Sequence, residues 1–381
     1  MRAAGGYDTP QGGSLTNTPF FPPEFTQASP APSDLDATMG RGGTSSSAKV
    51  PRILLMGLRR SGKTSIFKVV FHKMSPHETY FLESTVKTVQ YEVDYSSVLH
   101  FKVWDLAGAT GAEEGLIDDR RAFVGAGAVV FVLDAQDDHV MAVQYLLSTI
   151  QRAYALNKRI VFEVFIHKVD GLAEDRKLDL QREISHNVTK ELSERGLDDA
   201  NVAFYLSSIY DHSVYENVSK VVQKLVPQLA TLENLLDILI SNCRMEKAFF
   251  FDVLSKVYIA TDSQPVDEQW FELSSDMLDV VVDISCIYGQ DQEEESVAFD
   301  SGSAAIISLN NGMVLYMKEV SKYLALVCLM RQDNLQRQGL IEYNVDILKN
   351  SLKDVLTVGS VTPRASMSAA SEQGSMQGSM E

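Results

Sequence analysis

Residues 57–64 read GLRRSGKT, a combination suited to holding a chain of phosphate groups. Gly57 and Gly62 allow the backbone to turn so that its N–H groups surround an anion, and a helix starting here adds its positive end. Lys63 supplies a positive charge to the β- and γ-phosphates, and the Thr64 hydroxyl is suited to coordinate Mg²⁺. The segment predicts a phosphate-binding loop, the P-loop, with further nucleotide contacts from Arg60, Ser61, Gly62 and Ser65.

The surroundings of this loop are those that the GxxxxGK[ST] motif requires. The apolar run Arg52–Met56 comes before it, as a buried strand would, and helical spacing follows over residues 65–73. Taken alone, the motif also occurs by chance in a glycine-containing turn. Two further motifs bear on which interpretation is right.

The first is DLAG, residues 105–108, at the end of a second apolar run. Ligands of open α/β sheets bind at the carboxyl ends of the strands, so this position suits a phosphate site. We expect Asp105 to hold Mg²⁺ through water and the Gly108 N–H to meet the γ-phosphate. By itself a DxxG sequence is also a common strand-ending turn.

The second is HKVD, residues 167–170, which resembles the guanine-specifying NKxD motif with His in place of Asn. A carboxylate at Asp170 can accept hydrogen bonds from both N1–H and the 2-amino group of guanine, a donor pair that adenine lacks. Lys168 would lie along the base and ribose, and His167 could still donate a hydrogen bond. The alternative is a charged loop after a buried strand. Three motifs in the right order favour a site for GTP and GDP.

Two more segments complete the predicted site. Thr85, in a segment that we call switch I (residues 79–85), is the candidate for the threonine that meets Mg²⁺ and the γ-phosphate, and Thr79 is a further nucleotide contact. Ser208 and Ile209 follow the last strand, where backbone N–H groups support guanine. Catalysis would rest on positioning and charge stabilisation by Lys63, Thr64 and Thr85, without a covalent intermediate.

These residues need strands that end at one edge of a sheet. Short apolar runs rich in Val, Ile and Phe alternate with helical spacing between residues 51 and 225, which predicts a doubly wound parallel sheet. The predicted strands are residues 52–56, 100–104, 128–133, 160–166 and 202–206, with an antiparallel edge strand at 88–95. The helical stretches include residues 65–73, 140–156 and 178–192.

From residue 231 the order changes to helix, hairpin, helix, three strands and helix, which predicts a small α+β domain with an antiparallel sheet. Its predicted strands are residues 248–254, 256–261, 304–309, 313–320 and 324–330, and its helices are residues 232–240, 268–286 and 343–356. The runs at 279–287 and 324–330 are more apolar than one small core requires, which predicts an obligate interface. The alternative is that both runs lie in the domain's own core.

Both ends of the chain, residues 1–49 and 358–381, are rich in Gly, Ser, Pro or Thr and are predicted to be disordered tails. This leaves a GTPase domain at 50–230 and a second domain at 231–357. The 51 acidic and 34 basic side chains give a net charge of −17, which argues against binding to nucleic acid. Three scattered cysteines in apolar runs favour buried free thiols in a reducing compartment.

No apolar run reaches the roughly 18 residues that span a bilayer, and neither end carries a lipidation signal. We expect any attachment to a membrane to come through partners.

The chain resembles the Rag GTPases of the C/D subgroup over about residues 51–357. The segments that carry this resemblance include GLRRSGKTS, FHKMSP, FLEST, LDAQDD, FEVFIHKVDGL, FYLSSIYDHS, VVQKLVPQLATLENLL, EKAFFFDVLSKVYIATDS, DISCIYG and YLALVCLMR. HKVD in place of NKxD is specific to Rag proteins. The resemblance implies a P-loop GTPase fold, doubly wound, followed by a roadblock-like dimerisation domain.

The resemblance also implies a function. The chain would pair with a Rag GTPase of the A/B type and would be held at the lysosome or vacuole by a Ragulator-type scaffold. There it would report amino-acid sufficiency to the target-of-rapamycin kinase complex. The expected locations are the cytoplasm and the lysosomal or vacuolar surface, with the nucleus as a further compartment.

One departure from the family concerns hydrolysis. Position 109, after the DxxG glycine, is Ala where Rag proteins of this subgroup resemble other GTPases in carrying Gln, which orients the attacking water. Arg59 adds a long side chain that would crowd the γ-phosphate, and Glu113 or Glu114 could substitute for the missing amide. We expect slow turnover, and only a small gain in rate from Ala109→Gln.

The alternatives are a nucleotide-binding scaffold that does not turn over GTP, which Ala109 favours, and a P-loop small-molecule kinase, which HKVD disfavours.

Overall fold

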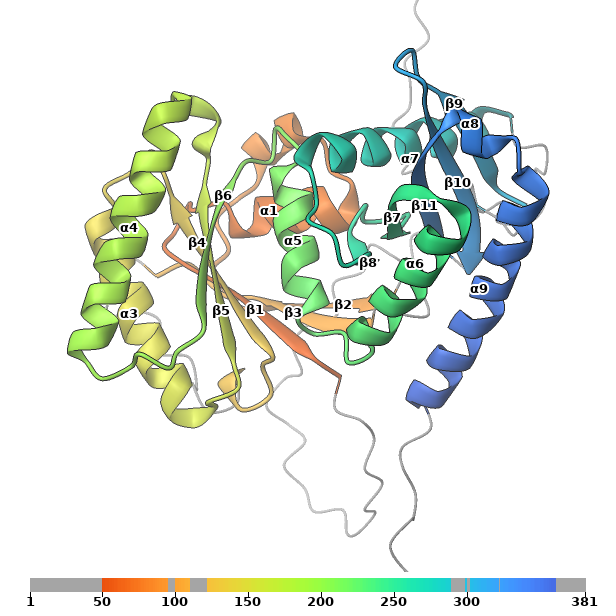
Figure 1. Cartoon of the computed structure of the whole chain (residues 1–381). Coiled ribbons are helices and arrows are strands. Elements are labelled where there is room, and N and C mark those ends of the chain that lie inside the picture. Colours follow the sequence, from red (N-terminus) through yellow and green to blue (C-terminus); the bar gives the residue numbers. More distant parts are fainter. Residues whose placement is uncertain are drawn as a thin grey trace, which may run out of the picture.

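The computed structural model describes residues 50–94, 100–109, 122–288, 299, 302–321 and 323–360. The predicted tail at 1–49, most of the tail predicted at 358–381, and Glu113 and Glu114 lie outside these residues. The described chain forms two sheets, one of six strands and one of five, with helices packed on both (Figure 1). Within the described part, no helix is long and apolar enough to cross a membrane.

The six-stranded sheet has the order β2-β3-β1-β4-β5-β6. All pairs are parallel except β2 with β3, which is antiparallel, so the predicted edge strand is confirmed. The strands are β1 (Arg52–Met56), β2 (Val89–Asp94), β3 (His100–Asp105), β4 (Ala128–Asp134), β5 (Val161–His167) and β6 (Val202–Ser207). The motifs at 57–64, 105–108 and 167–170 all begin at carboxyl ends of strands.

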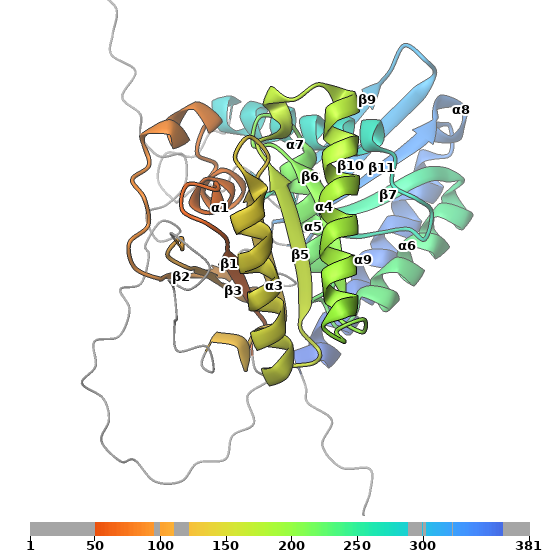
Figure 2. The ribbon, with the colours of Figure 1, turned by 90° about the vertical axis from the view of Figure 1, so that its left-hand side faces the viewer.

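Helices cover both faces of this sheet because neighbouring residues of a strand point in opposite directions. Along β4, Val129, Phe131 and Leu133 pack with α3 (His139–Leu156) and α4 (Glu174–Glu194). The alternate residues Val130 and Val132 pack with α1 (Lys63–His72) and α5 (Ser213–Gln223) on the other face. Figure 2 shows α3 and α4 together on the near face of the sheet. The doubly wound fold is therefore confirmed.

The five-stranded sheet has the order β8-β7-β11-β10-β9, with antiparallel pairs throughout. One face packs with α7 (Glu268–Tyr288) and the other with α6 (Leu229–Cys243) and α9 (Gln338–Ser360). The strands are β7 (Met245–Asp252), β8 (Tyr258–Thr261), β9 (Ala304–Ser308), β10 (Met313–Ser321) and β11 (Leu324–Arg331), and α8 (Gln332–Leu335) follows them. The predicted α+β architecture of this half is confirmed.

The two halves share one apolar core. The cluster that joins α1 and α5 to the first sheet continues into α6, α9 and the second sheet. The backbone N–H of Tyr258 donates to the Ser219 hydroxyl of α5 across this boundary, at 3.0 Å. Lys73, which follows α1, donates to the Val253 carbonyl at 3.4 Å. The second half therefore rests on the helix that leads from the P-loop into switch I.

The two apolar runs that predicted an interface differ in their exposure to solvent. Residues 324–330 form β11, which lies between two strands and is buried along this whole stretch, so for this run the interface prediction is wrong. Residues 279–287 belong to α7, which packs one face on the sheet and leaves an apolar stripe exposed. Two of the cysteines, Cys243 and Cys328, are buried free thiols as predicted, and the Cys286 side chain lies outside the described residues.

Candidate functional site

The P-loop turns sharply where β1 ends, and its glycines are required by the local geometry. Gly57 has φ +138°, and an added Cβ would lie 2.2 Å from the Val132 carbonyl oxygen. Gly62 has φ +102°, and an added Cβ would lie 2.5 Å from the His167 ring. Helix α1 begins directly after Gly62, so its free N–H groups and positive end point into the site. This loop is built to receive an anion.

Lys63 is the first residue of α1 and is 5% exposed. Its ammonium group donates to the carbonyl oxygens of Gly57, at 3.1 Å, and Leu58, at 2.9 Å. Burial lowers the pKa of this lysine to about 8, against which the charge of Asp105 acts. A bound phosphate would stabilise the ammonium form and raise that pKa again.

Three oxygen-bearing side chains meet beside Lys63, although they are far apart in the sequence. The Thr64 hydroxyl lies 2.8 Å from the Thr85 hydroxyl and donates to Asp105 Oδ2 at 2.5 Å. Asp105 is fully buried, its Oδ1 has no hydrogen-bond partner, and burial raises the pKa of its carboxyl group. A divalent cation would offset the free-energy cost of burying the charged Asp105 carboxylate. An all-oxygen donor set of two hydroxyls and one carboxylate fits Mg²⁺, which prefers few protein ligands together with phosphates.

The opposite end of the site is built by the HKVD segment. His167 is 1% exposed, its Nδ1 lies 3.2 Å from the Ser207 hydroxyl, and burial lowers its pKa to about 4. The imidazole is therefore neutral at physiological pH. Its ring packs beneath Gly62, so the segment that is predicted to select the base also supports the P-loop.

Lys168 has a left-handed backbone, φ +63°, which turns its side chain back across the site. Its ammonium group donates to the Arg60 carbonyl at 2.9 Å and to Asp134 Oδ2 at 2.5 Å. The Gln136 side chain donates to the Lys168 carbonyl at 2.9 Å. Two residues at the end of β4 therefore fix the position of Lys168.

Asp170 is positioned by the loop that follows β6. Its Oδ1 accepts a hydrogen bond from the Ser208 hydroxyl at 2.8 Å, while the Ser208 N–H donates to the Ser213 hydroxyl at 2.9 Å. The Tyr210 N–H donates to the Ser208 hydroxyl at 3.1 Å. This network leaves Asp170 Oδ2 available to a ligand.

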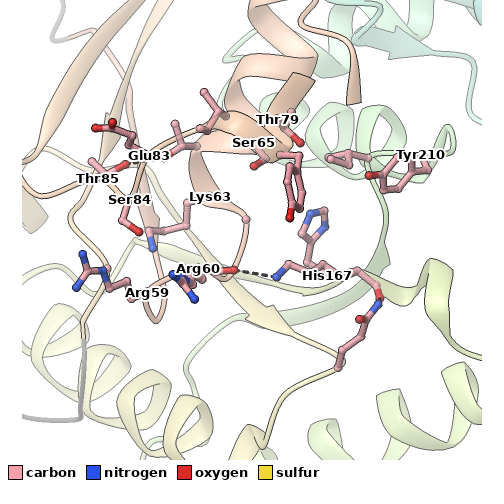
Figure 3. Close-up of a pocket in the computed structure, with 18 of the residues that line it drawn as sticks. Arg59, Arg60, Lys63, Ser65, Thr79, Glu83, Ser84, Thr85, His167 and Tyr210 are labelled. Carbon is pink, nitrogen blue, oxygen red and sulfur yellow. Dashed lines mark hydrogen bonds between the residues drawn. The ribbon is translucent and has the colours of Figure 1, made fainter. Parts of the chain in front are cut away.

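One cavity of about 990 Å³ joins the two ends (Figure 3). Most of the predicted site residues line it: Arg60, Gly62, Lys63, Thr64, Ser65, Thr79, Thr85, Gly108, His167, Lys168, Asp170 and Ile209. Ser61, Asp105 and Ser208 are buried behind its wall. The Thr79 hydroxyl donates to the Pro76 carbonyl at 2.7 Å. The cavity thus brings together the segments that are predicted to bind phosphate, metal and base.

Several lining residues were missed from the sequence. Gln136 lines the cavity just after β4, and Asp134, which pairs with Lys168, is the last residue of that strand, so the rule that ligands bind at strand ends could have found both. The residue types in segment 80–86 and at Tyr210 do not by themselves indicate a nucleotide site. The missed lining residues are Tyr80, Leu82, Glu83, Ser84, Val86, Gln136 and Tyr210.

Ala109 is packed against the P-loop. It is 4% exposed within the apolar cluster beneath α3, and it forms a parallel bridge with Leu58. The Arg59 N–H donates to the Ala109 carbonyl at 2.9 Å, and a Cβ on Gly108 would lie 2.5 Å from the Arg59 Cα. The side chain at position 109 therefore points into the protein and away from the solvent.

The Gtr1/RagA G protein conserved region matches residues 52–278. The Ras-related GTP-binding protein C of Homo sapiens is 53% identical over 324 residues, which cover 85% of this chain and 81% of that protein. The GTP-binding protein gtr2 of Schizosaccharomyces pombe is 47% identical over 312 residues, which cover 81% and 99%. The Ras-related GTP-binding protein A of Dictyostelium discoideum is 25% identical over 261 residues, which cover 67% and 85%.

Proposed function

Because the chain belongs to the Gtr1/RagA family of Ras-related GTP-binding proteins, we propose that it is a slowly hydrolysing guanine-nucleotide switch of the C/D type. It binds guanine nucleotides and is a GTPase of the Rag family. Identities of 53% and 47% to the C-type relative and to gtr2, against 25% to the A-type relative, support the subgroup. The observation that carries the function is one cavity lined by both the P-loop and the HKVD segment.

Mg²⁺ is the proposed metal. When bound, it would neutralise charge that develops on the phosphates. Thr64, Thr85 and, through water, Asp105 would hold it, while Lys63 and the loop amides would position the phosphates. Thr64→Asn removes one hydroxyl and leaves the loop amides, so GTP affinity should fall more than GDP affinity. Titration of both nucleotides with and without Mg²⁺ tests this, and an unchanged GTP-to-GDP ratio would contradict the assignment.

Slow turnover is proposed from the region around Arg59 and Ala109. Ala109 has no group that can orient water, and it is buried. Arg59 lines the cavity, where its side chain would stand beside the γ-phosphate. Single-turnover hydrolysis of GTP, with and without candidate activating proteins, tests the proposal. A rate typical of Ras-type enzymes without an activator would refute it, and no turnover even with an activator would favour the non-hydrolysing scaffold.

The proposed partner is a Rag GTPase of the A/B type. The exposed side of α7 carries an apolar stripe at helical spacing: Val280, Ile284, Ile287 and Tyr288. Among the described strands, β9 is at the edge of the sheet that α7 covers, and its Ala305 and Ile307 pack into the cluster under α7. An exposed apolar helix stripe over a sheet that ends in an edge strand suits pairing with a similar domain. Co-expression followed by light scattering tests for a 1:1 complex.

The remaining proposals concern location and signalling. A second apolar stripe on α9, formed by Leu340, Tyr343 and Ile347, supports binding to a Ragulator-type scaffold. Through that scaffold the complex would reach the lysosomal or vacuolar surface and signal to the target-of-rapamycin kinase complex, with the cytoplasm and nucleus as its other locations. Affinity purification from amino-acid-fed and starved cells, with mass spectrometry of bound proteins and nucleotide, tests this. Absence of scaffold subunits in both conditions would contradict it.

A further inference from the structure

Tyr80 lines the nucleotide cavity, yet it is 87% exposed. Its ring lies 5.7 Å from that of Phe81, which is itself 82% exposed and is not among the residues that line the cavity. A large aromatic ring at a cavity wall is stabilised when a ligand with an apolar face covers it and removes it from water. Tyr80 is therefore placed to contact a ligand, whereas Phe81 is not.

A chain of contacts shows which end of the cavity Tyr80 faces. Asp170, which we assign to the guanine edge, is bonded to Ser208, and Ser208 accepts from the Tyr210 N–H. The Tyr210 ring packs against the His77 ring, with 5.7 Å between their centroids. The start of the segment that leads into switch I is therefore attached to the base-binding loop.

His77 and Tyr80 both belong to the short 3-10 helix η2 (Pro76–Phe81). This helix has three residues per turn, so side chains three positions apart lie on the same face. Tyr80 therefore projects on the face that His77 presents to Tyr210. Figure 3 agrees, because Thr79 lies on the side of Tyr210 and His167, and Thr85 lies on the side of Arg59. Segment 77–85 thus runs from the base end of the cavity to the metal end.

A purine base has two flat faces, and each is stabilised by a neighbouring surface. The Lys168 side chain, held by Asp134 and the Arg60 carbonyl, crosses the site and offers one such surface. We propose that the Tyr80 ring stacks on the guanine base of bound GDP or GTP. Closure of the segment that carries Thr85 would then depend on the base as well as on the metal. This inference rests on the guanine-nucleotide function and adds a binding residue to the same site.

Dissociation of tritiated GDP and GTP from the full chain, bound to its partner if the chain requires one, tests the proposal. Tyr80→Ala removes the ring, so release of both nucleotides should accelerate about five- to a hundredfold, the range for loss of one aromatic–base stack. Tyr80→Phe keeps the ring and should release nucleotide at the wild-type rate. Phe81→Ala is the matched control, because it removes an equally exposed ring outside the cavity wall, and it should also match wild type.

A second measurement separates stacking from a general effect on switch I. Magnesium tripolyphosphate has no base, so its affinity should be the same for Tyr80→Ala and wild type. That affinity is obtained from competition with labelled GDP, after correction for the GDP affinity of each variant. An equal loss of tripolyphosphate affinity would overturn the proposal, as would equal release rates for Tyr80→Ala and Phe81→Ala. A wild-type chain that retains no labelled GDP would overturn the guanine-nucleotide function itself, whereas retention with unchanged release in Tyr80→Ala overturns this inference alone.

Discussion

His167 shows how a single side chain links the two ends of the nucleotide site. Its ring occupies the space that a side chain at position 62 would need, and its Nδ1 is paired with Ser207. A neutral, buried imidazole therefore supports the P-loop from below, while Lys168 and Asp170 of the same segment line the cavity. The exchange of Asn for His in this motif keeps a side chain with hydrogen-bonding capacity and adds a flat ring that packs beneath glycine.

Asp170 carries the choice of base. Asp170→Asn replaces an acceptor by a group that cannot accept from both N1–H and the 2-amino group, and an unpaired buried donor costs roughly 1–3 kcal/mol. GTP affinity should therefore fall by about tenfold or more, while affinity for xanthosine triphosphate rises. Competitive titration of the two nucleotides measures the change. Undiminished GTP binding would show that Asp170 does not contact guanine.

Lys63 predicts how nucleotide affinity depends on pH. Its pKa is lowered to about 8 in the free protein, and a phosphate partner raises it, so binding above pH 8 must take up a proton. The contribution of Lys63 to GDP affinity should not change with pH below pH 8, and above pH 8 it should reduce the affinity by up to tenfold per pH unit. Calorimetric titrations between pH 7 and 9 measure the slope. The variant Lys63→Met should bind more weakly at pH 7 and lose this part of the slope, and an identical slope in both would contradict the assignment.

The segment after β3 includes Gly108 and Ala109, the positions from which we expect the rate of hydrolysis to be set. Its first residues are attached to the P-loop through the bridge between Leu58 and Ala109 and the bond from the Arg59 N–H. This places the Gly108 N–H beside the phosphate site, as the motif requires. It also buries the side chain at position 109, for which the sequence alone suggested that an added Gln could orient the attacking water.

Ala109→Gln is therefore expected to bring no gain in hydrolysis, in place of the small gain that the sequence suggested. A buried amide without partners costs about 1–3 kcal/mol, so this segment should detach from the P-loop and the protein should lose stability of that order. Ala109→Gly retains the main-chain bonds and serves as the control. Single-turnover hydrolysis and thermal unfolding measure both effects, and faster hydrolysis in the Gln variant would show that position 109 reaches the attacking water.

At the scale of the whole molecule, the second half rests on helices of the nucleotide-binding half, including α1, which begins at the P-loop. The core that contains α1 and α5 continues into α6, α9 and the second sheet. The helix α7 caps the far face of that sheet and leaves its apolar stripe outside. A partner bound at α7 would therefore be connected to the helix that carries Lys63 and Thr64 through the second sheet, which packs with α7 on one face and with the core that contains α1 on the other.

Ile284, at 52% exposure, lies within the α7 stripe and tests the pairing surface. Ile284→Asp places a charge in an apolar interface, where an unpaired charge is strongly destabilising, so affinity for the A/B-type partner should fall about a hundredfold or more. Leu178→Asp on α4, where Leu178 is 49% exposed, is the matched control and should still form the complex. Light scattering of each variant co-expressed with the partner shows whether the complex forms. Both variants should retain guanine nucleotide, and an intact complex with Ile284→Asp would place the interface elsewhere.

The sequence by itself determined which binding motif follows which strand of the first sheet. GxxxxGKT, DxxG and HKVD are contiguous, and each follows an apolar run, so local spacing was enough to predict a GTP site at the strand ends. The alternation of apolar runs with helical spacing predicted the doubly wound sheet of the first half. The order of helices and strands after residue 231 predicted the antiparallel sheet of the second half. Both predictions hold because each strand's pattern reflects its own burial.

Only the tertiary structure decided what depends on contacts between distant segments. Residues 324–330 and 279–287 are both rich in apolar residues, yet the first run is a central strand and the second leaves a stripe exposed, because strand order is a property of the whole sheet. Ala109 is buried by residues from other elements. Asp134 matters because β4 and β5 are neighbours, which brings it to Lys168. Tyr80 has no sequence signal, since it is the packing of His77 on Tyr210 that brings its helix to the Asp170 end of the cavity.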